Sequence, residues 1–300
     1  MDMTQNKCCR HGANLRRKRR RRRKIRHSVI FLCSSIAVIV FVAVGIRMIT
    51  SGDGRTNRYD VEAGNNTYDN AVIENSKISE KNKIQNNQSM LDDIMNSTQY
   101  PKQLKDLALK NEEALEFVFD YPAEHVKENT IDLTEEASMD SVPLFVQWDK
   151  RWGYEKYSGN FFAASGCGPT TLSMVVVYLT HNRDASPIAV AKYSKEAGYS
   201  VDGSGSSWTL ISEGCMHYGV KAKAVALDES RMKAELDEGH PIVVNVGPGD
   251  FTDTGHFMVI TGYDDEGFSI NDPNSIEKSG KRWLFKNISS QIRAVWSMYV

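Results

Sequence analysis

The chain has 300 residues, enough for one or two domains with appendages, and a formal net charge of −1. This near-balance conceals an asymmetry, because residues 1–27 hold twelve Lys/Arg and one acidic residue, whereas residues 28–300 hold 25 basic and 37 acidic residues. Only two of the five cysteines, Cys167 and Cys215, lie beyond residue 46, which excludes a disulfide framework in the body of the chain.

A basic run and an apolar segment come first along the chain. The run Arg16–Arg26 alone is typical of a nucleic-acid-binding arm, but it precedes Ser28–Ile46, nineteen uncharged residues that can span a bilayer as a helix. Lys and Arg concentrate on the cytoplasmic side of spanning helices. We therefore predict a basic cytoplasmic tail (1–27), a single-pass transmembrane signal-anchor helix (28–46), an extracellular body and no nucleic-acid partner. A cleaved signal peptide is the alternative, although its apolar region normally runs roughly 7–15 residues.

The next hundred or so residues change in character twice. Residues 47–98 are rich in Asn, Asp, Ser and Lys with few large apolar residues, and this composition predicts a disordered stalk. Residues 99–140 form a predicted helical pre-domain segment, because Pro101–Phe119 places leucines and aromatics at helical spacing after a proline. Two short helices should end before Tyr121, and they either pack on the following domain or shield its cleft.

A compact domain is predicted over residues 141–300. Its patterns indicate helices first and strands later, which favours an α+β fold with a helix packed on an antiparallel sheet. The predicted helices are 169–179, 186–197, 207–218 and 229–238, and the predicted strands are 241–246, 256–263, 267–272 and 294–299.

Cys167 is the first candidate for chemistry, since it stands between two glycines at the start of the apolar helix. Unpaired N–H groups and the positive end of the helix dipole lower the pKa of a thiol there and favour the thiolate. The flanking glycines would leave room for a substrate chain and allow a sharp turn. The alternatives are a small apolar residue that caps a core helix, or a bridge to Cys215 that would abolish reactivity.

A thiolate catalyst needs a base, and His256 is the best-placed histidine because it opens a strand after a glycine-rich loop. A tight turn follows that strand, so an antiparallel hairpin should bring Asp272 within a residue or two of His256. A carboxylate there can accept the second ring N–H and fix the tautomer. The alternatives are a strand-end histidine and a turn-starting aspartate. The histidines that position argues against are His11, His27, His125, His181, His217 and His240.

Gln147 is a fourth candidate, because a side-chain amide together with the Cys167 N–H can form an oxyanion hole. A surface glutamine between core aromatics is the alternative. The Gly/Ser-rich segment Asp202–Trp208 lacks the lysine of a phosphate-binding loop, so we interpret it as a turn and cap beside the cleft. Cys215 and His217 have no second pair of metal-ligand type, and no cofactor is predicted.

Four motifs taken in order resemble the peptidases that process bacteriocin leaders and their stand-alone relatives in Gram-positive bacteria. The motifs are PLFVQWDKRWG, SGCGPTTLSMVVVYL, GPGDFTDTGHFMVITGY and INDPN, and the resemblance covers Val142–Val300. It implies a papain-like fold with a Cys–His–Asp triad. In this chain Cys167 would be the nucleophile, His256 the base and Asp272 the residue that orients it, with Gln147 as a helper.

The chain departs from that family in two respects. Papain-type enzymes usually place the helper glutamine six residues before the cysteine, where Phe161 stands here. Leader peptidases of this type are usually fused to a transporter, whereas this sequence has no ATP-binding motif, so the resemblance does not imply bacteriocin maturation.

The sequence therefore predicts a monomeric, membrane-anchored, extracytoplasmic cysteine peptidase that cleaves peptide bonds. A peptidoglycan endopeptidase or amidase of the same fold is an alternative, with a cell-wall peptide as substrate. A non-catalytic peptide-binding module is another.

Overall fold

The computed structural model describes residues 67–300, with side chains from residue 79 onward. Residues 70–300 form one compact unit. The predicted cytoplasmic tail and the predicted membrane anchor lie outside the described residues. Among residues 67–300, no helix combines the length and the apolar character needed to cross a bilayer.

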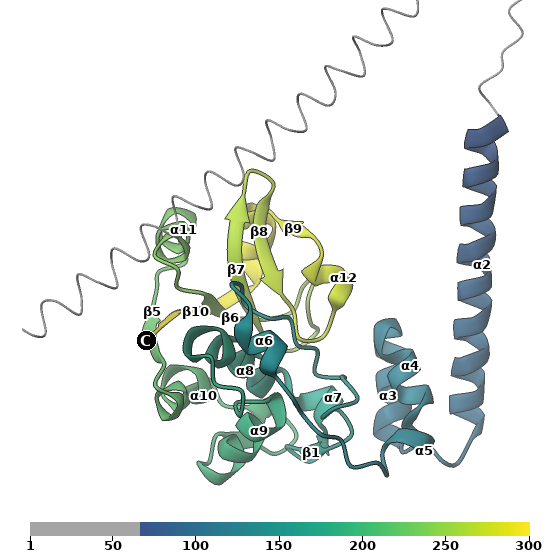
Figure 1. Cartoon of the computed structure of the whole chain (residues 1–300), viewed down its shortest axis with the longest axis horizontal. Helices are drawn as coiled ribbons and strands as arrows, with labels where there is room; N and C mark the ends of the chain where they lie inside the picture. The colour runs from purple at the N-terminus through teal and green to yellow at the C-terminus, as the bar shows by residue number, and fades with distance from the viewer. Residues whose placement is uncertain (1–66) are drawn as a thin grey trace, which may run out of the picture. The chain divides into compact units, whose positions relative to one another are not determined.

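The centre of the unit is a six-stranded antiparallel sheet in the order β5-β10-β6-β7-β8-β9 (Figure 1). Its strands are β5 (Lys221–Ala224), β6 (Ile242–Val246), β7 (His256–Asp264), β8 (Gly267–Asn271), β9 (Arg282–Trp283) and β10 (Ile292–Tyr299). Alternate residues of β6 point into different cores, because Val243 belongs to one apolar cluster while Ile242 and Val244 belong to another. Both faces of the sheet are therefore covered, which is why all five residues of β6 are buried.

The first core lies between the sheet and helix α8 (Cys167–Thr180), which is apolar almost all round. The Thr171 hydroxyl donates to the Phe257 carbonyl over 3.1 Å and ties α8 to strand β7. Helices α6 (Thr134–Ser138), α9 (Pro187–Glu196) and α10 (Thr209–Ser212) contact α8, and α7 (Phe162–Ser165) directly precedes it along the chain. The predicted α+β fold, with a helix on an antiparallel sheet, is confirmed.

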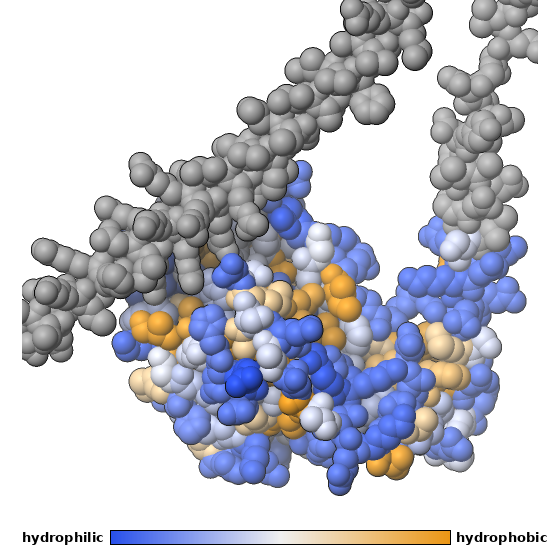
Figure 2. Space-filling model, viewed as in Figure 1, coloured by the Kyte–Doolittle hydropathy of each residue, from blue (hydrophilic) through white to orange (hydrophobic). Residues whose placement is uncertain are grey.

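The second core lies on the opposite face, where α11 (Glu229–Asp237) contributes Met232 and α13 (Phe285–Ile288) contributes Ile288. The short helix α12 (Ile276–Ser279) contacts β8 near its end. Most of the described surface visible in Figure 2 is hydrophilic, with hydrophobic residues in scattered groups, as expected where the large apolar side chains gather in internal cores.

A third core joins the segment before the domain to the loop that precedes α8. It contains side chains from helices α2 (Thr67–Asn96), α3 (Lys102–Lys110) and α4 (Leu115–Phe119), together with the buried Phe161. A 3-10 turn (Glu112–Ala114) joins α3 to α4, and α5 (Tyr121–Glu124) follows. The two short helices predicted before Tyr121 are thus present, and they pack on the domain.

The predicted disordered stalk is wrong for residues 67–96, which form α2. The composition argument averaged over the whole segment and missed a local apolar face formed by Met90, Leu91 and Ile94. Ile94 is fully buried, and Met90 and Leu91 pack against the same third core. Tertiary contact therefore stabilises the end of a helix that its overall composition does not favour.

The other difference lies after α9, where one helix was predicted over 207–218. The structure has α10 followed by a separate 3-10 helix, Gly214–Tyr218. Gly214 lies against Tyr199 and Leu210 so closely that an added Cβ would be 3.1 Å from the tyrosine ring. The sequence pattern also did not predict strands β5 and β9 or the hairpins β1–β2 (Lys156–Tyr157, Asn160–Phe161) and β3–β4 (Ser200–Val201, Gly205–Ser206).

Candidate active site

Cys167 is the first residue of helix α8, as predicted, and its side chain is half-buried. The backbone N–H groups of Gly168 and Phe257 both help to lower the pKa of this thiol. Both cysteines of the described region, Cys167 and Cys215, are free thiols, so no bridge joins them. Cys215 is fully buried in the first core, and this burial raises its pKa to about 11. The two thiols therefore differ, because the pKa of Cys215 is raised whereas that of Cys167 is lowered.

The glycines on either side of Cys167 serve packing within the protein. Gly166 has an ordinary backbone conformation, with φ of −87°. A Cβ at Gly166 would lie 2.6 Å from the ring of Phe162, and one at Gly168 would lie 2.6 Å from the Oγ of Ser206. The sequence argument assigned these glycines to a turn and to substrate access, whereas the structure requires them because neighbouring side chains approach the backbone closely.

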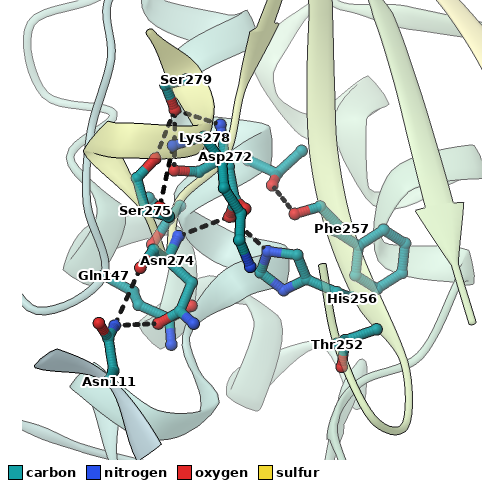
Figure 3. A network of polar contacts seen from close by, with 12 residues as sticks. Asn111, Gln147, Thr252, His256, Phe257, Asp272, Asn274, Ser275, Lys278 and Ser279 are labelled. Carbon is teal, nitrogen blue, oxygen red and sulfur yellow. Dashed lines mark hydrogen bonds and ion pairs between the residues drawn. The ribbon is translucent and has the colours of Figure 1, made fainter. Parts of the chain in front are cut away.

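His256 is the first residue of β7, opposite Val246 of β6, and only 6% of its surface is exposed. His256 also interacts with the Cys167 thiol, because each of these two groups is among the causes that shift the pKa of the other. Its Nε2 lies 2.7 Å from the Oδ1 of the fully buried Asp272 (Figure 3). An ionised carboxylate can only accept, so Nε2 carries the proton of this bond and Nδ1 is left for the sulfur.

The hairpin β7–β8 brings Asp272 to His256 in the way the sequence predicted. Val259 pairs with Asn271, so the same register extended to His256 reaches Asn274, two residues beyond Asp272. Asp272 follows the last residue of β8 and turns back into the space beside the imidazole. Its Oδ1 also accepts the Asn274 N–H over 2.8 Å.

The electrostatics of the three groups favour a thiolate–imidazolium pair. Burial by itself raises the pKa of the Cys167 thiol, but the hydrogen bond and the charge of His256, with the two backbone N–H groups, outweigh it and lower that pKa. Burial by itself lowers the pKa of His256, but the charge and hydrogen bond of Asp272, together with Cys167, raise it to about 10. Both shifts favour transfer of the thiol proton to the imidazole.

Gln147 is buried, with 4% of its surface exposed, so it is not the surface residue that the alternative required. Its Nε2 donates to the carbonyl of Ala163, four residues before the cysteine, over 2.7 Å. Its backbone N–H donates over 2.7 Å to the carbonyl of Pro273, the residue after Asp272. Gln147 thus bridges the approach to the cysteine and the turn of the aspartate, and an amide nitrogen has a second N–H to offer. Its Oε1 has no hydrogen-bond partner in the described part of the chain.

The remaining described histidines lie in other settings. His125 bonds the Tyr121 carbonyl, His181 bonds the Ala137 carbonyl, His217 stacks on Tyr193 and His240 pairs with Glu235. Among the described histidines, the one that lowers the pKa of Cys167 is His256, which the elimination argument favoured.

The glycine-serine segment before α10 forms the β3–β4 hairpin, in which Gly205 adopts a φ of +85°. Trp208 follows it, is 47% exposed, and lies edge-on to Trp296 at 6.1 Å between ring centroids. The predicted turn is present, but the predicted cap is not: the residue before α10 is Trp208, and no side chain caps this helix. The Ser207 hydroxyl accepts the Thr209 N–H over 3.3 Å within the turn.

Sequence reasoning missed the polar residues around Asp272, namely Asn111, Glu113, Asn274, Ser275 and Ser279. Three of them follow Asp272 within seven residues, where the turn signal Asp-Pro-Asn was visible. The other two come from the pre-domain segment, and no local pattern links them to the turn.

Comparison with known proteins adds the family. The sequence model of the Peptidase_C39 like family matches residues 139–300, more than half of the chain. The peptidase domain of Streptococcus ComA, a bi-functional ABC transporter involved in quorum sensing, is 19% identical, with 45% of this chain and 90% of that chain covered and a TM-score of 0.36. A Bacillus anthracis protein described as C39-like is 18% identical, with 53% and 95% covered and a TM-score of 0.33. No curated protein sequence matches. From the family match, this chain belongs to the Peptidase_C39 like family.

Proposed function

We propose that this protein is a cysteine peptidase that cleaves peptide bonds with Cys167 as nucleophile, His256 as base and Asp272 as the residue that orients the base. One observation carries the proposal: Nε2 of His256 lies 2.7 Å from a buried carboxylate, and the same imidazole lowers the pKa of a half-buried thiol at a helix start. Membership of a peptidase-like family supports the same reaction.

The mechanism follows from these contacts. The Cys167 thiolate attacks the carbonyl carbon of a substrate amide, and the negative charge moves to the carbonyl oxygen. The Cys167 N–H at the start of α8, with the free amide N–H of Gln147, would donate to that oxygen. Protonated His256 gives its proton to the leaving amine, which departs and leaves a thioester on the sulfur. His256 then takes a proton from water, the resulting hydroxide attacks the thioester, and the acid product and the thiol are released.

The proposal also includes a location. A basic segment followed by an uncharged stretch, Ser28–Ile46, favours a single-pass anchor with the catalytic domain outside the cell. Treatment of intact cells with an added protease tests this arrangement, because it should remove the domain and spare the residues before the anchor. A domain that survives on intact cells and is cut only after lysis would contradict it.

The decisive experiment for the catalytic proposal is mapping of iodoacetamide labelling in the folded protein. Cys167 should be alkylated at mildly acidic pH, where an ordinary thiol with a pKa of about 8.5 is almost unreactive. Cys167→Ala should abolish that labelling and all hydrolysis. Cys215→Ala is the matched control, because this free thiol is fully buried and burial raises its pKa, and the variant should keep both.

Substrate class is tested with the same proteins. Wild type and Cys167→Ala are incubated with a peptide library and, separately, with purified muropeptides, and products are read by mass spectrometry. Thiol-dependent cleavage in the peptide library alone supports the proposed peptidase. Cleavage confined to muropeptides would instead establish the cell-wall alternative. If neither substrate is cleaved and Cys167 is no more reactive than an ordinary thiol, the domain is a binding module.

A further inference from the structure

The position of Asp272 depends on the turn that follows it. Strand β8 ends at Asn271, and an isolated bridge joins Asp272 to Ser275. The Asp272 N–H donates to the Ser279 hydroxyl over 2.9 Å, and its carboxylate accepts the Asn274 N–H over 2.8 Å. The position of the Asp272 carboxylate therefore depends on the conformation of residues 272–275. Contacts that fix this turn also fix the carboxylate that accepts from His256.

A carboxylate from outside the family-matched region is bonded to this turn. Glu113 lies in the 3-10 turn between α3 and α4, well before residue 139, where the family match begins. It accepts the hydroxyl of Ser275, the N–H of Ile276 over 2.7 Å and the N–H of Glu277 over 3.0 Å. One charged side chain thus satisfies three donors at the start of α12, and bonds to a charged acceptor are stronger than neutral ones.

Asn111 adds a second hold on the same turn. Its Nδ2 donates to the carbonyl of Asn274 over 2.9 Å and to the Oδ1 of Asn274 over 3.1 Å. Its Oδ1 accepts the N–H of Glu113 over 3.0 Å, so the two residues also fix one another. Figure 3 shows Asn111 beside Asn274 and, beyond them, Asp272 directed at His256.

The base of this support is packed into the third core. Ala114 and Leu115 directly follow Glu113 and are buried in the third core, as is Leu107 of α3. The ring of Phe117 stacks on Tyr154 with 4.2 Å between centroids, and the Tyr154 hydroxyl donates to the Phe117 carbonyl over 2.7 Å. The pre-domain helices are thus fixed to the segment before α8 on one side and to the aspartate turn on the other.

We propose that Asn111 and Glu113 are positioning residues of the active site, which hold turn 272–275 so that the Asp272 carboxylate keeps its hydrogen bond to His256. The inference rests on the proposed role of Asp272 in orienting His256. It makes the pre-domain helices a part of the catalytic unit. The region matched by the family contains the three reacting groups and some contacts to the turn, such as that of Gln147 with Pro273, but it lacks Asn111 and Glu113.

The test compares Glu113→Ala with Glu112→Ala in the full-length protein. Glu112 is the neighbouring carboxylate, and it accepts from Asn87 of α2 over 2.8 Å. Within the described part of the chain its side chain forms no hydrogen bond with residues 272–277, so Glu112→Ala controls for loss of a helix–helix contact. Alkylation of Cys167 by iodoacetamide is followed at that residue by peptide mass spectrometry over a pH series. Circular dichroism and denaturant unfolding report the folded fraction.

Glu113→Ala should lower the alkylation rate at mildly acidic pH by about tenfold and move the midpoint of the profile toward that of an ordinary thiol, since a displacement of about 1 Å at a catalytic group can cost about a hundredfold. Glu112→Ala should leave rate and midpoint unchanged. A folded Glu113→Ala protein with the wild-type midpoint overturns the inference, because a merely structural contact would change stability alone. If Glu113→Ala does not fold, Glu113→Gln replaces it, because glutamine keeps the shape of the side chain and one acceptor oxygen. The midpoint of Cys167 alkylation again decides, and the expected shift of that midpoint is smaller.

Asp272→Asn separates failure of this inference from failure of the proposed function. If Asp272→Asn shifts the midpoint and Glu113→Ala does not, only the positioning role fails. If Asp272→Asn itself has no effect, the orienting role of Asp272 fails, and the inference with it. When both variants shift the midpoint, the double variant should add little to Asp272→Asn, because the two changes act on one contact.

Discussion

At the scale of single residues, the site consists of three groups that perturb one another. The Cys167 thiol is lowered in pKa although burial opposes this, and the His256 pKa rises to about 10 although burial opposes that as well. Each shift depends on the partner, because each charge is stabilised mainly by the other charges and not by water. Removal of one partner should therefore change the titration of the others.

Asp272→Asn tests that dependence. The carboxylate is the main cause that raises the pKa of His256, so its loss should bring that pKa down from about 10. The imidazolium needed to protonate the leaving amine then persists only to a lower pH, so the alkaline limb of the kcat/KM profile should shift to lower pH. We also expect kcat to fall at least about tenfold. The measurement is a pH–rate profile on a peptide that the wild type cleaves. An unshifted alkaline limb would contradict the assignment of the orienting carboxylate.

At the scale of elements, the least expected feature is helix α2, because its composition indicated disorder. Its contact with the third core depends on a few residues near its end, of which Ile94 is fully buried while Ile84 is 62% exposed. The Lys105 ammonium of α3 also donates to the Met95 carbonyl over 2.9 Å and holds the end of α2.

These two isoleucines provide a matched pair of substitutions in one helix. Ile94→Ala should lower the free energy of unfolding by about 2–4 kcal/mol, because a buried aliphatic side chain is replaced by a cavity. Ile84→Ala should change it by less than about 0.5 kcal/mol, as is usual for an exposed position. Urea unfolding of both variants provides the comparison. Equal, small effects would mean that α2 does not pack on the domain.

At the scale of the whole molecule, the described unit is larger than the region that the family match covers. Aromatic residues of the matched region, such as Tyr154 and Phe161, lie against the pre-domain helices, and Lys150 pairs with Asp120. Without those helices the apolar rings would face water, which costs roughly 25 cal/mol per Å² of exposed apolar surface.

Two fragments measure this dependence. A fragment of residues 79–300 should unfold cooperatively and retain the acid-shifted alkylation of Cys167. A fragment of residues 139–300 should unfold at a lower urea concentration, or aggregate, since it lacks most of the third core. Urea titration with light scattering compares them. Identical midpoints and identical Cys167 reactivity would show that the family-matched region is self-sufficient.

The sequence by itself determined the elements and groups that depend on local pattern. Helix periodicity, a proline in the first turn and glycine punctuation predicted α8, α9 and α11, and strand alternation with a tight turn predicted the hairpin that pairs His256 with Asp272. The order of Cys167, His256 and Asp272 with the surrounding motifs was enough to predict the family.

Only the tertiary structure decided what depends on contacts between distant segments. It decided that Gly166 and Gly168 serve close packing against Phe162 and Ser206, that α2 is a helix, and that Asn111 and Glu113 reach the turn of Asp272 across more than 160 positions. A short apolar face or a single surface carboxylate has no periodic signature, because its partner lies elsewhere in the chain and the free energy of the contact appears only when both are folded together.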